Sequence, residues 1–96
     1  MLSVPDEIKD TIIQILRGYG AKKISIFGSF ARGEDRPESD IDIIVRFEKP
    51  KSLLQLIHIE EEIKKAVQHN IDLLTENSIN PYLIDSIRRD EVVIYG

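Results

Sequence analysis

The 96-residue sequence contains no cysteine. This absence excludes disulfides and thiolate metal sites. The sequence also lacks any apolar run near the roughly 20 residues that a membrane-spanning helix needs. Its first residues, MLSVPDEIKD, do not have the basic-then-apolar order of a secretory signal. We therefore expect no membrane association and a cytoplasmic location.

Positive charge is in short supply. Lysine and arginine number 13 against 17 aspartates and glutamates, which gives a formal net charge of −4 at pH 7. Because non-specific nucleic-acid binding depends on cationic side chains meeting phosphates, no direct nucleic-acid binding is expected. Hydrophobic residues make up 42% of the chain and charged residues 31%. This balance predicts one folded domain over residues 1–96.

Candidate chemistry is concentrated in residues 28 to 47, GSFARGEDRPESDIDIIVRF. Asp40 and Asp42 open a β-branched run there, separated by one isoleucine. Residues two apart on a strand project from the same face with Cα atoms about 6.6 Å apart, so both carboxylates can reach one or two cations. Mg²⁺ prefers oxygen ligands and is commonly held by one or two carboxylates together with substrate phosphates. The pair therefore indicates a metal–nucleotide site.

Gly28 and Ser29 follow the apolar run KKISIF and supply the complement to the acidic pair. A strand that ends at glycine and turns into a short helix presents backbone N–H groups to a phosphate, and the serine adds a hydroxyl. A lone D-x-D is usually a solvated strand face, and a lone Gly-Ser pair is usually a turn. Their conjunction at this spacing favours the functional interpretation.

The segment GSFARGEDRPESDID resembles the signature of the minimal nucleotidyltransferases, small members of the DNA polymerase beta superfamily. The resemblance extends over the whole chain. It implies that Asp40, Asp42 and Asp72 form the catalytic metal site, with two Mg²⁺ ions, or Mn²⁺, as cofactors. Asp72 would bind the catalytic metal and accept the proton of the acceptor. Gly28 and Ser29 would hold the β- and γ-phosphates of ATP.

Arg32 is placed to add a charge-assisted phosphate contact. A surface salt bridge with Glu34 or Asp35 is an equally good interpretation.

Periodicity predicts a first helix that runs from the Ser3 cap to about residue 17, and further helices over about 53–68 and 80–89. Strands are predicted over about 23–28, 40–47, 71–75 and 92–95. Ser3 and Asp6 have capping-box spacing at the first helix, with Pro5 in its first turn, and Ser52 can cap the second. The expected apolar stripe of the second helix is Leu53, Leu56, Ile57, Ile63, Ala66 and Val67. Glu60 falls inside this stripe and is interpreted as an edge carboxylate that reaches solvent. Leu54 falls outside it and is either an exposed edge residue or part of a partner-facing patch.

The positions of the candidate site residues also predict the topology. If Gly28 lies beside Asp40, the first two strands are antiparallel; if Asp72 joins the acidic pair, the second and third are parallel and joined by a right-handed helical crossover. The expected fold is an α/β (α+β), nucleotidyltransferase-like fold. It has a small mixed β-sheet, helices packed on one face, and an open acidic active-site face.

The family resemblance implies an antitoxin that transfers AMP from ATP to a tyrosine of a small helical HEPN ribonuclease toxin. Two alternatives stay open: a non-catalytic antitoxin that acts by binding alone, and a small-molecule nucleotidyltransferase of the aminoglycoside-modifying type. A homodimer and a hetero-oligomer with the toxin are both compatible with the sequence.

Overall fold

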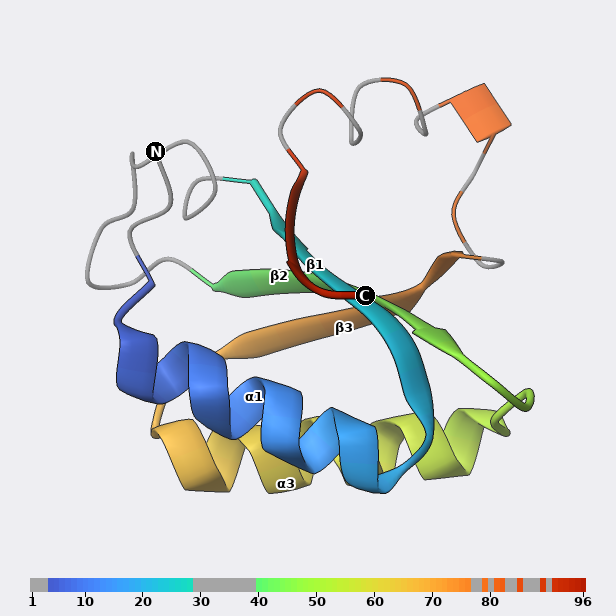
Figure 1. Ribbon diagram of the computed structural model, residues 1–96. Helices are drawn as coiled ribbons and strands as arrows, with labels where there is room; N and C mark the ends of the chain where they lie inside the picture. Colours follow the sequence, from blue (N-terminus) through green and yellow to red (C-terminus); the bar gives the residue numbers. More distant parts are fainter. Residues whose placement is uncertain are drawn as a thin grey trace.

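A mixed β-sheet forms the centre of the fold in the computed structural model, which describes residues 4–28, 40–76, 79, 81, 82, 85, 89 and 91–96. The elements are α1 (Asp6–Gly18), β1 (Ala21–Phe27), β2 (Ile41–Phe47), α3 (Leu53–Val67), β3 (Ile71–Thr75) and β4 (Val92–Tyr95). The strand order is β3-β2-β1-β4. Figure 1 shows α1 and α3 side by side on one face of this sheet.

Strand pairing confirms the expected topology. β1 pairs antiparallel with β2, and β2 pairs parallel with β3. The chain passes from β2 to β3 through α3, as a parallel connection requires. β4 pairs antiparallel with β1, so β3 and β4 form the two edges of the sheet.

Helix α1 begins after Pro5, which occupies the N-cap and makes no side-chain capping hydrogen bond. The predicted capping box at Ser3 is therefore wrong; Ser3 itself lies outside the described residues. Proline fixes its own φ near the value that a helix start needs, so the helix can begin without a polar cap. Ile12 and Leu16 of this helix are fully buried in the core.

Helix α3 begins at the capping box expected from Ser52. The Ser52 hydroxyl accepts the N–H of Gln55 at 3.2 Å, and the Gln55 side chain accepts the N–H of Ser52 at 2.8 Å. Its buried positions, Ile59 and Ile63, differ in part from the expected stripe. Ile59 is not part of the expected stripe, but its side chain is buried, with 1% exposed. Ile57 is part of the expected stripe, but it is 49% exposed.

The error has a geometric cause. The helix carries apolar residues over more than half of its circumference, so periodicity alone permits two faces. Packing beside α1 chooses the face that contains Ile59 and leaves Leu53 exposed. Tyr19, after the end of α1, donates a hydrogen bond of 2.6 Å to Glu62 of α3, and this contact together with burial raises the pKa of Tyr19.

The main core lies between the sheet and the two helices. Its fully or almost fully buried members are Val4, Ile12, Leu16, Ala21, Ile24, Ile26, Ile41, Ile43, Val45, Ile59, Ile63, Ile71 and Leu73. The opposite face is open at its acidic end, where Asp40 and Asp72 are exposed. Farther along this face, Ser25 and Ile44 are buried, so the open area is smaller than the sequence predicts.

Residues 81, 82, 85 and 89 are helical, in agreement with the expected last helix; its other positions lie outside the described residues. Among the described helices, none is long and apolar enough to cross a membrane.

The phase of α3 can be tested with Ile59→Ala and its matched control Ile57→Ala. Removal of the buried Ile59 side chain should lower the free energy of unfolding by about 3 kcal/mol, because it leaves a cavity. The control should lose about 1 kcal/mol or less, since Ile57 is half exposed. Urea-induced unfolding followed by circular dichroism measures both, and equal losses would contradict the observed packing.

Candidate active site

Three of the predicted site residues lie in a row across adjacent strands. Asp42 of β2 pairs with Asp72 of β3 in the parallel ladder and with Phe27 of β1 in the antiparallel one. Gly28 follows Phe27 directly. Neighbouring strands are about 4.8 Å apart, so the row extends over about 10 Å. The strand register therefore brings together residues that are up to 44 positions apart in the sequence.

Gly28 lies close to the Asp42 carboxylate. Its φ is +77°, and a Cβ built at this position would collide with Oδ2 of Asp42. The positive φ favours glycine here, and a larger residue would also push the Asp42 carboxylate aside. The end of β1 and the Asp42 carboxylate therefore lie next to each other in the candidate site.

Asp40 lies directly before β2 and is exposed. The N–H of the next residue, Ile41, donates to the carbonyl of Asn70 at 2.9 Å, so the starts of β2 and β3 are tied together. Strand alternation places Asp40 on the same face as Asp42. Asp72, on that face of β3, is exposed, and Asp42 is half-buried.

These carboxylates have the chemistry that a hard divalent cation requires. Among the residues that the structure describes, no three His, Asp or Glu side chains are gathered closely enough to hold a metal ion. Asp40 and Asp72 are exposed, so their side chains can change rotamer without displacing packed neighbours. Donor type and strand placement fit the cation, and the role of Asp40, Asp42 and Asp72 as ligands stays a prediction.

Ser29 and Arg32 lie outside the described residues. Their predicted phosphate contacts therefore stay predictions.

Glu60 has a role that the sequence did not reveal. Its Oε2 accepts the N–H of Leu73 at 3.1 Å, on the edge strand β3 and directly after Asp72. Its Oε1 lies 3.4 Å from Nζ of Lys64, and this contact is the main reason why the pKa of Lys64 is raised. In the sequence, the position of Glu60 inside an apolar stripe indicated that this carboxylate is unusual. Its partner, the Leu73 N–H, is identified only by the tertiary structure.

The mixed sheet with carboxylates at its open end is compatible with the predicted nucleotidyltransferase fold. The family model "Polymerase beta, Nucleotidyltransferase" matches residues 10–96, and the chain belongs to this family.

Two curated relatives carry more specific names. The chain is 47% identical over 87 residues to a provisionally named protein adenylyltransferase of Methanocaldococcus jannaschii, covering 91% of this chain and 94% of the relative. It is 34% identical over 76 residues to the protein adenylyltransferase MntA of Thermococcus cleftensis, covering 79% and 77%.

Solved structures show the same fold. A toxin–antitoxin complex with AMP-PNP matches with a TM-score of 0.84 at 23% identity, covering 92% of this chain and 73% of that chain. A tri-AMPylated Shewanella oneidensis HEPN toxin in complex with an MNT antitoxin matches with a TM-score of 0.78 at 20% identity, covering 95% and 71%.

Gly28→Ala tests the contact with Asp42, and Gly20→Ala is its matched control. Both glycines have positive φ, +77° and +89°, but a Cβ at Gly20 meets nothing within 4 Å. Each variant should lose about 1 kcal/mol of stability through backbone strain. Only Gly28→Ala should also reduce nucleotidyl transfer, by about a hundredfold, because it displaces the Asp42 carboxylate. Thermal unfolding and a transfer assay measure the two effects, and equal activity in both variants would refute a special role for Gly28.

Glu60→Ala should remove the acceptor of the Leu73 N–H and loosen β3 next to Asp72. We expect a loss of about 1 kcal/mol in stability and faster hydrogen exchange at the Leu73 amide. Glu60→Gln should restore slow exchange, because its amide oxygen can still accept the bond. Glu61→Ala is the control, since Glu61 also lies near Lys64 but makes no contact of this kind with β3 among the described interactions. Unchanged Leu73 exchange in Glu60→Ala would contradict this role.

Proposed function

We propose that this protein transfers AMP from ATP to a tyrosine hydroxyl of a partner HEPN-type ribonuclease toxin and thereby acts as an antitoxin. The main support within the chain is the row formed by Gly28, Asp42 and Asp72. The names of the curated relatives support protein adenylylation, and the complexes with the same fold support a HEPN partner.

The reaction is a nucleotidyl transfer. The acceptor oxygen attacks the α-phosphorus of ATP and forms the new P–O bond, while the bond between the α-phosphorus and the bridging oxygen breaks. Pyrophosphate leaves with that electron pair. The proton of the acceptor hydroxyl passes to the Asp72 carboxylate, which lies on the exposed side of the row.

Asp40 and Asp42 are the proposed ligands of the Mg²⁺ ions. The phosphates of ATP and the carboxylates of the row are all negatively charged and would repel each other. Cations bound between them, and shared by both, would remove this repulsion. Bound Mg²⁺ would neutralise charge on the transferring phosphoryl group and on the leaving pyrophosphate. The chain's own part is to hold the carboxylates on one face through strand register.

The phosphate turn is proposed at the other end of the row. Gly28 ends β1 with positive φ, and Ser29 follows it with a hydroxyl. We propose that this turn holds the β- and γ-phosphates, with Arg32 as an additional contact. The α-phosphate would then lie near Asp42, between the turn and Asp72.

Asp42→Asn tests whether catalysis is needed. The purified protein is incubated with Mg²⁺, ATP and a HEPN-type toxin from the same organism, and the mass of that toxin is measured. The wild type should add AMP, and Asp42→Asn should lower the rate by at least about a hundredfold, because one charged ligand is lost. Asp10→Asn makes the same charge change on an exposed position of α1 and should have no effect.

The alternatives give different outcomes in this assay. An antitoxin that acts by binding alone would neutralise the toxin equally well as wild type and as Asp42→Asn, without a mass shift. A small-molecule nucleotidyltransferase would modify free hydroxyl compounds, such as aminoglycosides, without the protein acceptor. Either result would refute AMP transfer to the toxin as the function.

A further inference from the structure

The groups of the proposed reaction have a fixed order across the sheet. Gly28 lies at the end of β1, Asp42 on β2 and Asp72 on β3. β3 is an edge strand of the sheet that the structure describes. The phosphate turn and the proposed proton acceptor are thus at opposite ends of the row. An acceptor hydroxyl that meets Asp72 on the side away from the phosphates lies at the β3 edge.

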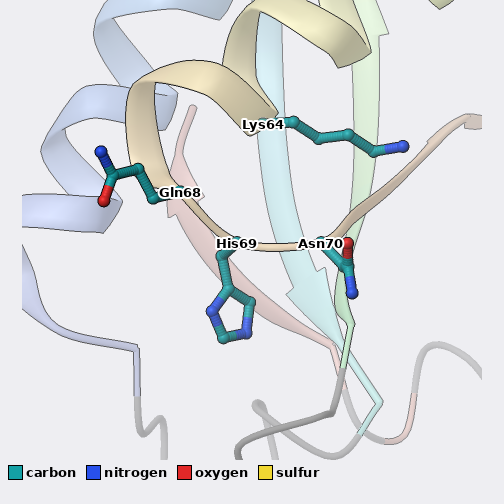
Figure 2. A pocket seen from close by; sticks show the side chains of 4 residues that line it. All are labelled: Lys64, Gln68, His69 and Asn70. Atoms are coloured by element: carbon teal, nitrogen blue, oxygen red, sulfur yellow. The ribbon is translucent and has the colours of Figure 1, made fainter.

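A polar pocket lies at this edge of the sheet. Among the described residues it is lined by Lys64, Gln68, His69 and Asn70, from the last turn of α3 and the turn into β3, and its volume is about 340 Å³ (Figure 2). In Figure 2, Gln68 extends to the left and Lys64 to the right, whereas His69 and Asn70 point below the turn. We call this feature the edge pocket.

A backbone hydrogen bond links the edge pocket to the strand that carries Asp42. The Asn70 carbonyl accepts the N–H of Ile41 at 2.9 Å, and Ile41 lies between Asp40 and Asp42 in the sequence. Asn70 precedes β3 by one residue and Asp72 is the second residue of β3. Only one residue therefore separates the pocket lining from the proposed proton acceptor.

The lining is rich in hydrogen-bond donors. Lys64 supplies an ammonium group, Gln68 and Asn70 supply amides, and His69 supplies an imidazole. Glu60 and Glu61 lie 3.4 and 3.7 Å from the Lys64 ammonium, and the hydrogen bond to Glu60 is the main reason why the pKa of Lys64 is raised. An ammonium that is already paired with two carboxylates offers a hydrogen-bond donor rather than free positive charge. Together with two amides it suits the backbone carbonyls of a polypeptide segment.

We propose that the edge pocket binds the acceptor protein beside the hydroxyl that receives AMP, with Lys64 and Asn70 hydrogen-bonding the backbone carbonyls of that segment. The inference rests on the proposed function and adds the place where the acceptor is recognised. ATP phosphates are the alternative ligand for Lys64. The strand order argues against them, because the phosphate turn lies on the far side of Asp42.

The test compares Lys64→Gln and Asn70→Ala with the matched control Lys65→Gln. Lys65 is exposed, lies on the same helix and does not line the pocket. Transfer of AMP from ATP–Mg²⁺ to the same HEPN-type toxin is measured over a range of acceptor and ATP concentrations. Lys64→Gln should raise the KM for the acceptor about tenfold, as expected for the loss of one charge-assisted hydrogen bond. Asn70→Ala should raise it several-fold, at the scale of a neutral bond.

The KM for ATP, the rate at saturating acceptor and the thermal unfolding midpoint should stay close to wild type in these variants. Lys65→Gln should match wild type in every measurement. A merely structural role for Lys64 would instead lower the unfolding midpoint or change both KM values together.

Three outcomes would overturn the inference. If Lys64→Gln and Asn70→Ala leave the acceptor KM within twofold of Lys65→Gln while wild type is active, the edge pocket does not bind the acceptor. If Lys64→Gln raises the KM for ATP alone, the pocket belongs to the nucleotide. If wild type transfers no AMP to the partner, the proposed function itself is wrong and the inference falls with it.

Discussion

The parallel pairing of β2 with β3 is the constraint on which both the core and the candidate site depend. It sets Ile41 beside Ile71 and Asp42 beside Asp72 in one ladder. A slip of one residue would turn Asp72 toward the helices and expose Ile71, because side chains alternate along a strand. Burial of the isoleucines therefore fixes the acidic pairing. The apolar face enforces the geometry of the polar one.

Gly28 on one side of the β2–β3 pair and Glu60 on the other support this pairing. On the β1 side, Gly28 leaves room for the Asp42 carboxylate to lie close to the backbone, and a Cβ at this position would displace it. On the outer side, Glu60 crosses from α3 and accepts the Leu73 N–H of edge strand β3. An edge strand has unpaired backbone groups that a side chain can satisfy. The same helix residue also orients Lys64 at the edge pocket, so support of the strand and shaping of the pocket are linked.

Sequence patterns predicted the elements well where period and local chemistry agree. The strands around Asp42 and Asp72, the Ser52 capping box and the relative strand directions are all found. The predictions failed where the local sequence was compatible with two arrangements, as at the start of α1 and for the buried face of α3. Pro5 rather than Ser3 precedes α1, and α3 buries Ile59 rather than Ile57. Helical periodicity cannot choose between neighbouring apolar arcs, because that choice depends on which surface packs against the helix.

The sequence by itself determined the family, the fold class and the acidic candidates, because strand alternation and the spacing of Gly28 from Asp40 and Asp42 are properties of the local chain. The tertiary structure alone decided that Gly28 contacts the Asp42 carboxylate, that Glu60 binds the backbone beside Asp72, and that donor groups gather at the β3 edge. These are contacts between residues distant in the chain. Their existence depends on how the helix and strands pack, which no local pattern encodes.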